Sequence, residues 1–187
     1  MILGAASYNN TARDNGWAAI CDGTANFDHP DLRRFLALWR RTRAQGPLAW
    51  SNLPPLLKPY LPDAAVYQRT SSGEERRWRV VRMGSHFAQI MGNLSGKFLD
   101  EVIPAGTLPR WYAALDATLG GDGPLRFLAR VDNSGMPFLT GEYFTAPLIG
   151  EDGSASLVLS VGRFTGGRRW DEIADEARLA LGLGRPA

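Results

Sequence analysis

The sequence predicts an α+β fold in which a five-stranded antiparallel sheet carries helices on one face. Two strand-like runs, residues 64–69 and 77–83, are separated by a short turn over residues 71–74, and three more strand-like runs fill the last third of the chain. Only helical patterns lie between the two groups, so strands and helices are segregated along the chain. The 187 residues suffice for one domain of ordinary size with extensions.

The composition is that of a packed globular protein, with 44% hydrophobic and 21% charged residues. The formal net charge of +2 creates no global field that would require nucleic acid or an anionic membrane as partner. The single cysteine, Cys21, excludes an internal disulfide and a cysteine-rich zinc site. No apolar run is long enough for a membrane span, and the N-terminus lacks the pattern of a signal peptide, so we expect a cytoplasmic protein.

The segments before the core are predicted to be an arm, a helix and a connector. Residues 1–27 are small and polar without a sustained hydrophobic period, which predicts a loosely structured arm. Residues 28–62 are predicted to form an amphipathic helix over 28–43 and a proline-rich connector. The apolar stripe of this helix consists of Leu32, Phe35, Leu36 and Trp39. Because the stripe carries two aromatic side chains, we expect it to be a dimer or partner surface.

The core is predicted to span residues 63–165 and to be organised around the stretch 83–104. Three glycines divide that stretch into two short helical segments: Gly84, Gly92 and Gly96. Helices this short are marginal alone, so they must lie on the sheet. A longer helix over residues 108–119 follows, with Pro109 in its first turn and glycines at its end.

The last third is predicted to be an antiparallel meander followed by a helical tail. The three strands cover residues 125–131, 138–149 and 155–164, with turn residues at 132–135 and 150–153. Pro147 predicts a sheet edge or a bulge near the end of the middle strand. The tail, residues 166–187, is expected to be helical over 170–181 and to dock on its own domain or on a second copy.

This order of elements resembles the PAS plan of two strands, short helices, one longer helix and three strands. More closely, the chain resembles a bacterial PAS-type family common in alphaproteobacteria as small stand-alone proteins. The matching pieces cover most of residues 31–165: FLALWRRTR, LPPLLKPYLPDAAVY, RVVRMGSHFAQIMGNLSGKFLDEV and YFTAPLIGEDGSASLVLSVGRF. The resemblance implies a non-catalytic sensory or protein-interaction module, and we expect it to be a homodimer or to signal to a separate output chain.

The resemblance also bears on cofactors. Flavin-binding relatives that form a light-induced adduct need a cysteine among the short helices, and residues 83–104 contain none. Haem-binding relatives commonly use a histidine on the longer helix, and residues 108–119 contain none. A flavin adduct and haem are therefore disfavoured, and the identity of any ligand is left open. The two histidines, His29 and His86, form no metal-binding spacing with Cys21, and His29 is expected to cap a helix.

A pocket is expected where the sheet meets the short helices. The candidate lining residues are Phe87, Met91, Trp111, Leu115, Phe127, Tyr143 and Ser160. Tyr143 and Ser160 would supply polar contacts among apolar walls. The alternative is that the same side chains simply fill the core.

Two other functions stay open. The arginines of the 28–43 helix could bind nucleic acid or a membrane surface in a salt-sensitive manner, although the sequence lacks the interleaved aromatics and the matching basic strand of such sites, so we expect no nucleic acid. A small cone-like α+β enzyme could use a buried Asp or Tyr as acid or base. Asp100 and Glu101 are adjacent and point about 100° apart on a helix, so they make a poor catalytic pair, and we expect no enzyme.

Overall fold

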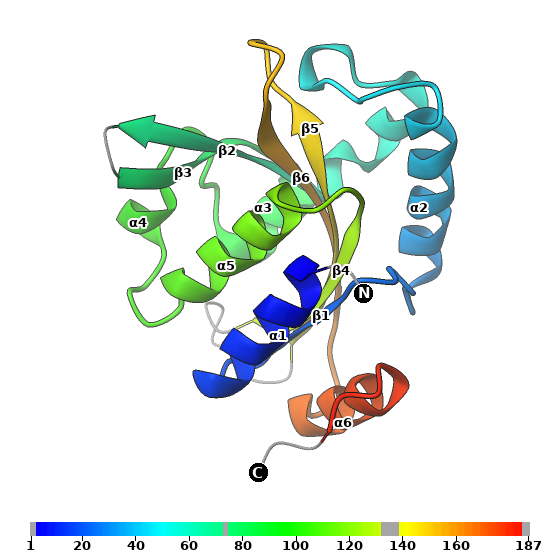
Figure 1. Ribbon diagram of the computed structural model, residues 1–187, viewed down its shortest axis with the longest axis vertical. Helices are drawn as coiled ribbons and strands as arrows, with labels where there is room; N and C mark the ends of the chain where they lie inside the picture. Colours follow the sequence, from blue (N-terminus) through cyan, green and yellow to red (C-terminus); the bar gives the residue numbers. More distant parts are fainter. Residues whose placement is uncertain (1–2, 73–74, 132–138, 185–187) are drawn as a thin grey trace.

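A computed structural model describes residues 3–72, 75–131 and 139–184. Its centre is a six-stranded antiparallel sheet in the order β1-β4-β5-β6-β2-β3. The strands are β1 (Ala19–Asp22), β2 (Ala64–Ser72), β3 (Glu75–Met83), β4 (Leu125–Arg130), β5 (Thr140–Ile149) and β6 (Ala155–Thr165). The helices are α1 (Leu3–Asp14), α2 (Pro30–Arg43), α3 (Ser85–Met91), α4 (Leu99–Val102), α5 (Leu108–Leu119) and α6 (Trp170–Ala180), with 3₁₀ segments η1 (Trp50–Asn52) and η2 (Pro55–Asp63) (Figure 1).

The α+β fold class with an antiparallel sheet is confirmed, with one strand more than expected. The five predicted strands and the longer helix are present, and α5 has the predicted bounds. The predicted turn over residues 132–135 and positions 73–74 of the first turn lie outside the described residues. Among the described helices, none combines the length and the apolar character needed to cross a bilayer.

The additional strand comes from the N-terminal segment, where the prediction of a loose arm is wrong. Helix α1 packs against α5, and β1 pairs with β4. The contact between α1 and α5 is made largely by small side chains around Tyr8. The two backbones lie so close that a β-carbon added at Gly4 would stand 2.9 Å from the carbonyl oxygen of Ala117. Small residues pack by close approach of the two backbones, so this segment shows no wide apolar stripe to read in the sequence.

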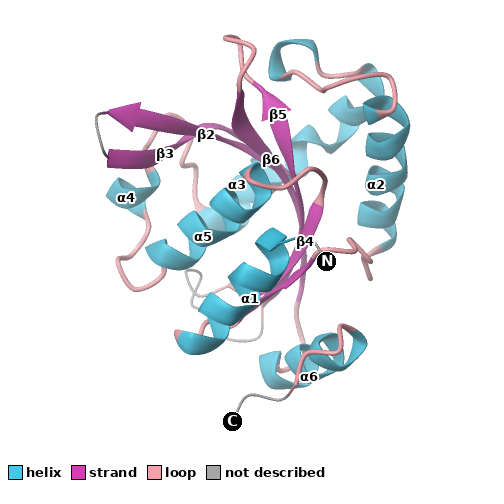
Figure 2. Ribbon diagram, in the orientation of Figure 1, coloured by secondary structure: helices cyan, strands magenta, loops and turns pink. Residues whose placement is uncertain are grey.

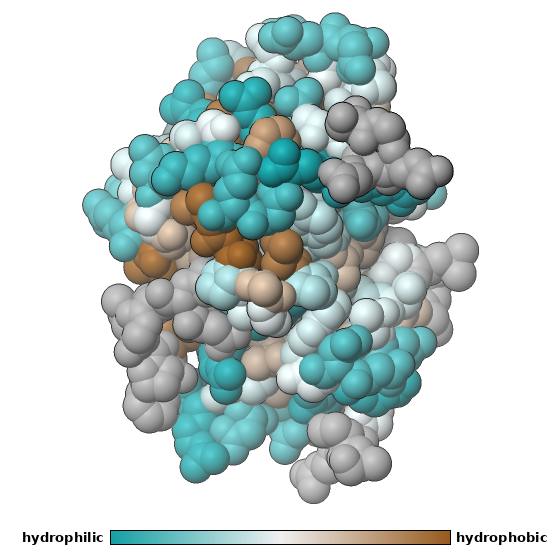
Figure 3. All heavy atoms as spheres, turned by 90° about the vertical axis from the view of Figure 1, so that its left-hand side faces the viewer, coloured by the Kyte–Doolittle hydropathy of each residue, from teal (hydrophilic) through white to brown (hydrophobic). Residues whose placement is uncertain are grey.

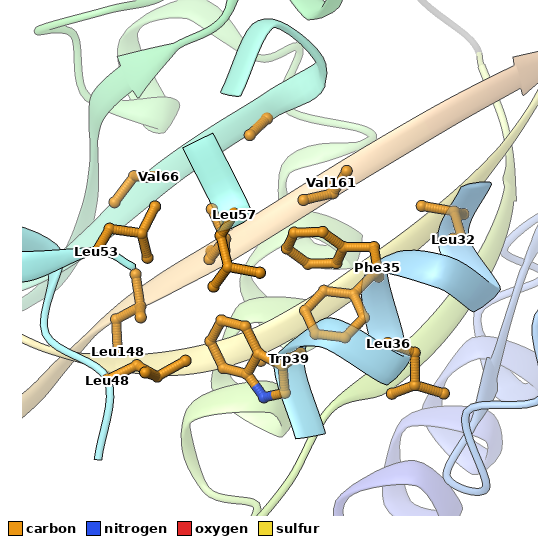
Figure 4. Close-up of a cluster of buried hydrophobic side chains, with 14 of the residues drawn as sticks. Leu32, Phe35, Leu36, Trp39, Leu48, Leu53, Leu57, Val66, Leu148 and Val161 are labelled. Atoms are coloured by element: carbon orange, nitrogen blue, oxygen red, sulfur yellow. The ribbon is translucent and has the colours of Figure 1, made fainter. Parts of the chain in front are cut away.

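The predicted interface stripe on α2 is also wrong, because its side chains lie in the core. Helix α2 and η2 cover the face of the sheet opposite α5, so both faces are covered rather than one (Figure 2). The rings of Phe35 and Trp39 lie 4.8 and 5.3 Å from that of Phe144 on β5. All four predicted interface residues are buried in this cluster: Leu32, Phe35, Leu36 and Trp39 (Figure 4).

Alternation along β5 and β6 assigns each side chain to one face of the sheet. Phe144 and Ala146 face α2, and their neighbour Tyr143 belongs to the face covered by α3 and α5. On β6, Val158 lies on the α5 side and Leu159 on the α2 side. The two faces therefore have separate cores, and only the α5 side contains the candidate site.

The glycine-punctuated stretch fits closely under β2 and β3. A β-carbon at Gly84 would collide with the backbone of Leu61 and Pro62, and its N–H donates to the carbonyl oxygen of Ala64 at 2.7 Å. Gly92 and Gly96 have φ angles of +78° and +83°, which other residues rarely adopt. These three glycines let two short helices turn sharply between the sheet and η2.

The remaining predictions for the C-terminal part are confirmed. Pro147 pairs with Val158 of β6, and the pairing of β5 with β4 ends at Thr145, so Pro147 lies past the end of the β4 pairing. A register shift between β5 and β6 follows after Leu148. Helix α6 docks on its own domain, with Ala174 and Ala177 against β1 and β4.

Candidate functional site

A cavity of about 80 Å³ lies between the sheet and the helices on the α5 side. Its walls come from β2, β4, β5 and β6 and from α1, α3 and α5. The seven residues proposed from the sequence all line it: Phe87, Met91, Trp111, Leu115, Phe127, Tyr143 and Ser160. A volume of this size has room for several water molecules or one compact apolar group.

Aromatic side chains form much of the wall. The ring of Phe87 packs against those of Tyr143 and Phe164 at 6.1 and 5.6 Å. On the other side, Tyr67 meets Trp111 edge to face at 6.1 Å. Rings packed in this way hold a cavity open, because each has few rotamers in which it could turn inward.

Several lining residues were missed by the sequence analysis. Thr145 lies two positions after Tyr143 on the same strand face, so the period of 2 would have found it. Tyr67 occupies the cavity side of β2, which alternation alone leaves undecided when both faces are buried. Tyr8 could not be found, because its segment was predicted to be a loose arm.

The floor of the cavity carries hydroxyl groups. Thr145 and Ser160 are register partners on β5 and β6. The hydroxyl of Thr145 is hydrogen bonded to that of Thr118 at 2.8 Å, and Thr118 donates to the carbonyl oxygen of Ala114 at 2.8 Å. Thr145 therefore has an internal partner.

Tyr67 is different, because its hydroxyl is buried without a hydrogen-bond partner among the described residues. The residue is 1% exposed and lines the cavity. Leaving a buried hydroxyl unpaired costs about 1–3 kcal/mol. Burial raises the pKa of Tyr67 above its ordinary value, so the phenol keeps its proton and can donate it in a hydrogen bond.

Positive charge lies at the end of the cavity formed by β4 and α5. Arg110 and Arg130 both line it, and Arg110 Nη2 donates to the carbonyl oxygen of Arg130 at 3.4 Å. Burial raises the pKa of Tyr8, and the nearby guanidinium of Arg110 offsets part of that rise. No Asp, Glu, His or Cys belongs to the described cavity lining.

The histidines and the cysteine lie elsewhere. His29 is the N-cap of α2, as predicted, and its Nδ1 accepts the N–H of Asp31 at 3.2 Å. His86 is exposed, with Nδ1 3.1 Å from Asp63. Cys21 is buried on β1, among the residues that pack α1 on the sheet. Within the described ranges, no three His, Cys, Asp or Glu side chains are grouped so that they could hold a metal ion.

An ionic cluster around the buried Arg126 anchors the start of α2. Arg126 of β4 is paired with Asp28 and Glu142, and Asp22 lies 3.8 Å from it. Glu142 also accepts the backbone N–H groups of Asp28 and His29, both at 2.8 Å. The cluster ties the segment between β1 and α2 to the sheet, and its charged groups are occupied by one another.

Two outer surfaces are relevant to partners. On the face that is the left side of Figure 1, hydrophobic side chains gather in the middle among hydrophilic ones (Figure 3). On α2, Arg40, Arg41 and Arg43 are exposed, whereas Arg33 donates to the carbonyl oxygens of Phe27 and Asp28. The arginine face required by the adaptor hypothesis therefore exists, although part of it is engaged within the chain.

Comparison with known proteins gives only distant similarity. No family model matches the chain, and no curated protein matches it either. Among solved structures, it is similar to a sensory box histidine kinase/response regulator from Burkholderia thailandensis E264, with 19% identity over 68% of this chain and 92% of that chain and a TM-score of 0.34. It is also similar to an RNA-binding light-oxygen-voltage receptor, with 14% identity over 96% of this chain and 58% of that chain and a TM-score of 0.39. The PAS-like description of this chain rests on its own order of elements.

Proposed function

We propose that this PAS-like chain is a sensory or regulatory module that binds a small ligand in the cavity between α5 and the sheet. The observation that carries the proposal is Tyr67, a residue of the cavity wall whose buried hydroxyl lacks a hydrogen-bond partner among the described residues. A ligand with an acceptor group would satisfy it. The apolar walls would hold the body of that ligand, as is usual for small-molecule sites.

The proposal includes an output to a separate chain, as in the small stand-alone PAS-type proteins that the sequence resembles. Tyr8 of α1 belongs both to the cavity wall and to the cluster that packs α1 on the sheet. A ligand that contacts Tyr8 would bind more tightly when α1 is docked, and would shift the docking equilibrium by that difference in affinity. We therefore place the partner or dimer surface on the N-terminal unit of α1 and β1 rather than on the buried stripe of α2.

Native mass spectrometry of the purified protein tests ligand binding, together with an absorption spectrum of the same sample. We expect an additional small mass on the wild-type chain. Ala114→Phe places a ring at the cavity wall and should abolish the additional mass, whereas Ala37→Phe makes the same change at an exposed position of α2 and should retain it. A wild-type chain without any additional mass would contradict the proposal and favour a filled core that acts through protein contacts alone.

A further inference from the structure

Strand β1 is an edge strand whose outward hydrogen-bonding groups are bound by one side chain. In the order of the described strands it stands at one end of the sheet, next to β4. The carbonyl oxygen of Ala18, just before the strand, accepts the N–H of Arg130 on the β4 side. Because an antiparallel ladder alternates, the N–H and C=O of Cys21, three residues later, point away from β4. There Asn9 of α1 binds both groups: its Oδ1 accepts the N–H and its Nδ2 donates to the carbonyl oxygen, each at 2.8 Å.

The Asn9 amide therefore takes the place of a neighbouring strand at this position. In an antiparallel sheet, a residue of the next strand offers the same donor and acceptor to the residue opposite it. Cys21 is buried, so its N–H and C=O need a new partner whenever α1 carries Asn9 away. An extended chain is such a partner, because an uncovered strand edge pairs readily with another strand.

The packing of α1 on the sheet buries little large apolar surface. Among the described side chains of this helix, those of Ala5, Tyr8 and Ala12 are buried, and two of these three are alanines. Helix α2, by contrast, buries two aromatic and two leucine side chains. Because apolar stabilisation scales with the area buried, α1 is held less firmly than α2, and segments of this kind open at the lowest free energy. Helix α1 lies over β1, so its release uncovers the strand edge (Figure 1).

We propose that β1 is a strand-pairing site for a second copy of this chain, closed while α1 is docked and open when α1 is released. The two strands pair antiparallel, with Cys21 opposite the partner's Cys21, because the two residues then exchange both of their hydrogen bonds. Such a contact is self-complementary, as a two-fold symmetric dimer requires. This inference rests on the proposed function, because it names the partner that responds to the docking of α1.

Sedimentation velocity over a range of protein concentrations tests the proposal with the full chain. Asn9→Ala removes both hydrogen bonds that hold α1 over the strand edge, so we expect its dimer dissociation constant to be at least about tenfold lower than that of the wild type. Asn10→Ala is the matched control, because Asn10 lies on the exposed side of the same helix. It should behave as the wild type does.

A short bismaleimide then tests which surface forms the dimer. Two residues opposite each other in a hydrogen-bonded antiparallel pair have their α-carbons roughly 5.5 Å apart. Since Cys21 is the single cysteine of the chain, a covalent dimer formed by this reagent places the two β1 strands side by side. We expect the covalent dimer for Asn9→Ala and much less of it for Asn10→Ala at the same concentration.

A folded Asn9→Ala chain that stays monomeric would overturn the strand-pairing site, and so would a dimer that the bismaleimide does not join. Circular dichroism checks the fold. If Asn9→Ala does not fold, Asn9→Asp decides, because it keeps the acceptor for the N–H of Cys21 and loses only the donor; it too should dimerise more tightly than the wild type. None of these measurements involves a ligand, so their outcome is separate from the native mass spectrum that tests the cavity.

Discussion

The ring of Tyr143 lies against the bare backbone of Gly141, two residues earlier on the same face of β5. A β-carbon added at Gly141 would collide with the hydroxyl and ring carbons of Tyr143. Gly162, the register partner of Tyr143, makes room on the other side, where an added β-carbon would stand 3.2 Å from the ring. Gly141 and Gly162 thus leave the space that the Tyr143 ring occupies in the cavity wall.

Gly141→Ala should therefore force the Tyr143 ring to move into the cavity. We expect the free energy of unfolding to fall by about 1–3 kcal/mol, the usual cost of overpacking a core. Urea unfolding measures it. Gly123→Ala is the matched control, because nothing lies within 4 Å of a β-carbon there and the expected change is within about 0.5 kcal/mol. A Gly141→Ala chain as stable as the wild type would contradict the placement of Tyr143.

Trp39→Glu distinguishes a core position from an interface. Trp39 is 2% exposed within the single chain, so a carboxylate there would be buried without a partner of opposite charge. We expect loss of the folded state, seen as loss of the near-ultraviolet circular dichroism signal and of a cooperative thermal transition. Ala37→Glu, on the exposed side of the same helix, should fold normally. A folded, monomeric Trp39→Glu protein would restore the interface hypothesis.

Much of the architecture could be predicted because the sequence patterns that indicate each element lie within a single segment. The bounds of α5 follow from an early proline, an apolar stripe and terminal glycines, all within one segment. The apolar stripe on α2 was also identified correctly from the spacing of its residues. However, such a pattern shows that a face is buried without showing against what, and here the partner is β5 of the same chain.

The parts that could not be predicted depend on contacts between distant segments. Helix α1 packs through small residues, so its sequence contains little apolar periodicity. The seven candidate residues meet in one cavity, but Tyr67 was not among them. Its importance lies in a hydroxyl that has no partner, and that property exists only once the surrounding chain is in place.

Glu142→Gln should destabilise the fold, because Glu142 joins the buried Arg126 to the start of α2. Removing the charge of one member of a buried ionic cluster costs about 3–5 kcal/mol when the remaining charge is left poorly compensated. Asp22 and Asp28 still face Arg126, so we expect about 3 kcal/mol by urea unfolding. Glu151→Gln, at an exposed turn, should change little. Equal stability of both variants would show that the cluster contributes nothing.

The thiol of Cys21 reports whether α1 and β1 are docked. Cys21 is 1% exposed, and burial raises the pKa of its thiol, so at pH 8 little reactive thiolate is present in the folded protein. We expect Ellman's reagent to modify the thiol rapidly in denaturant and only slowly in native buffer, and a cavity ligand to slow it further. Because the chain has a single cysteine, the signal has one source. Rapid reaction in native buffer would contradict a docked N-terminal unit.

The most direct measurement of the central claim is ligand retention by Tyr67→Phe in native mass spectrometry. The substitution removes only the unpartnered hydroxyl, so the ligand-free protein should be as stable as the wild type or more stable. If that hydroxyl anchors the ligand, the affinity should fall about tenfold and the retained fraction with it. Tyr60→Phe removes a hydroxyl outside the cavity and should retain the wild-type fraction. Equal retention by Tyr67→Phe and the wild type would contradict the proposed site.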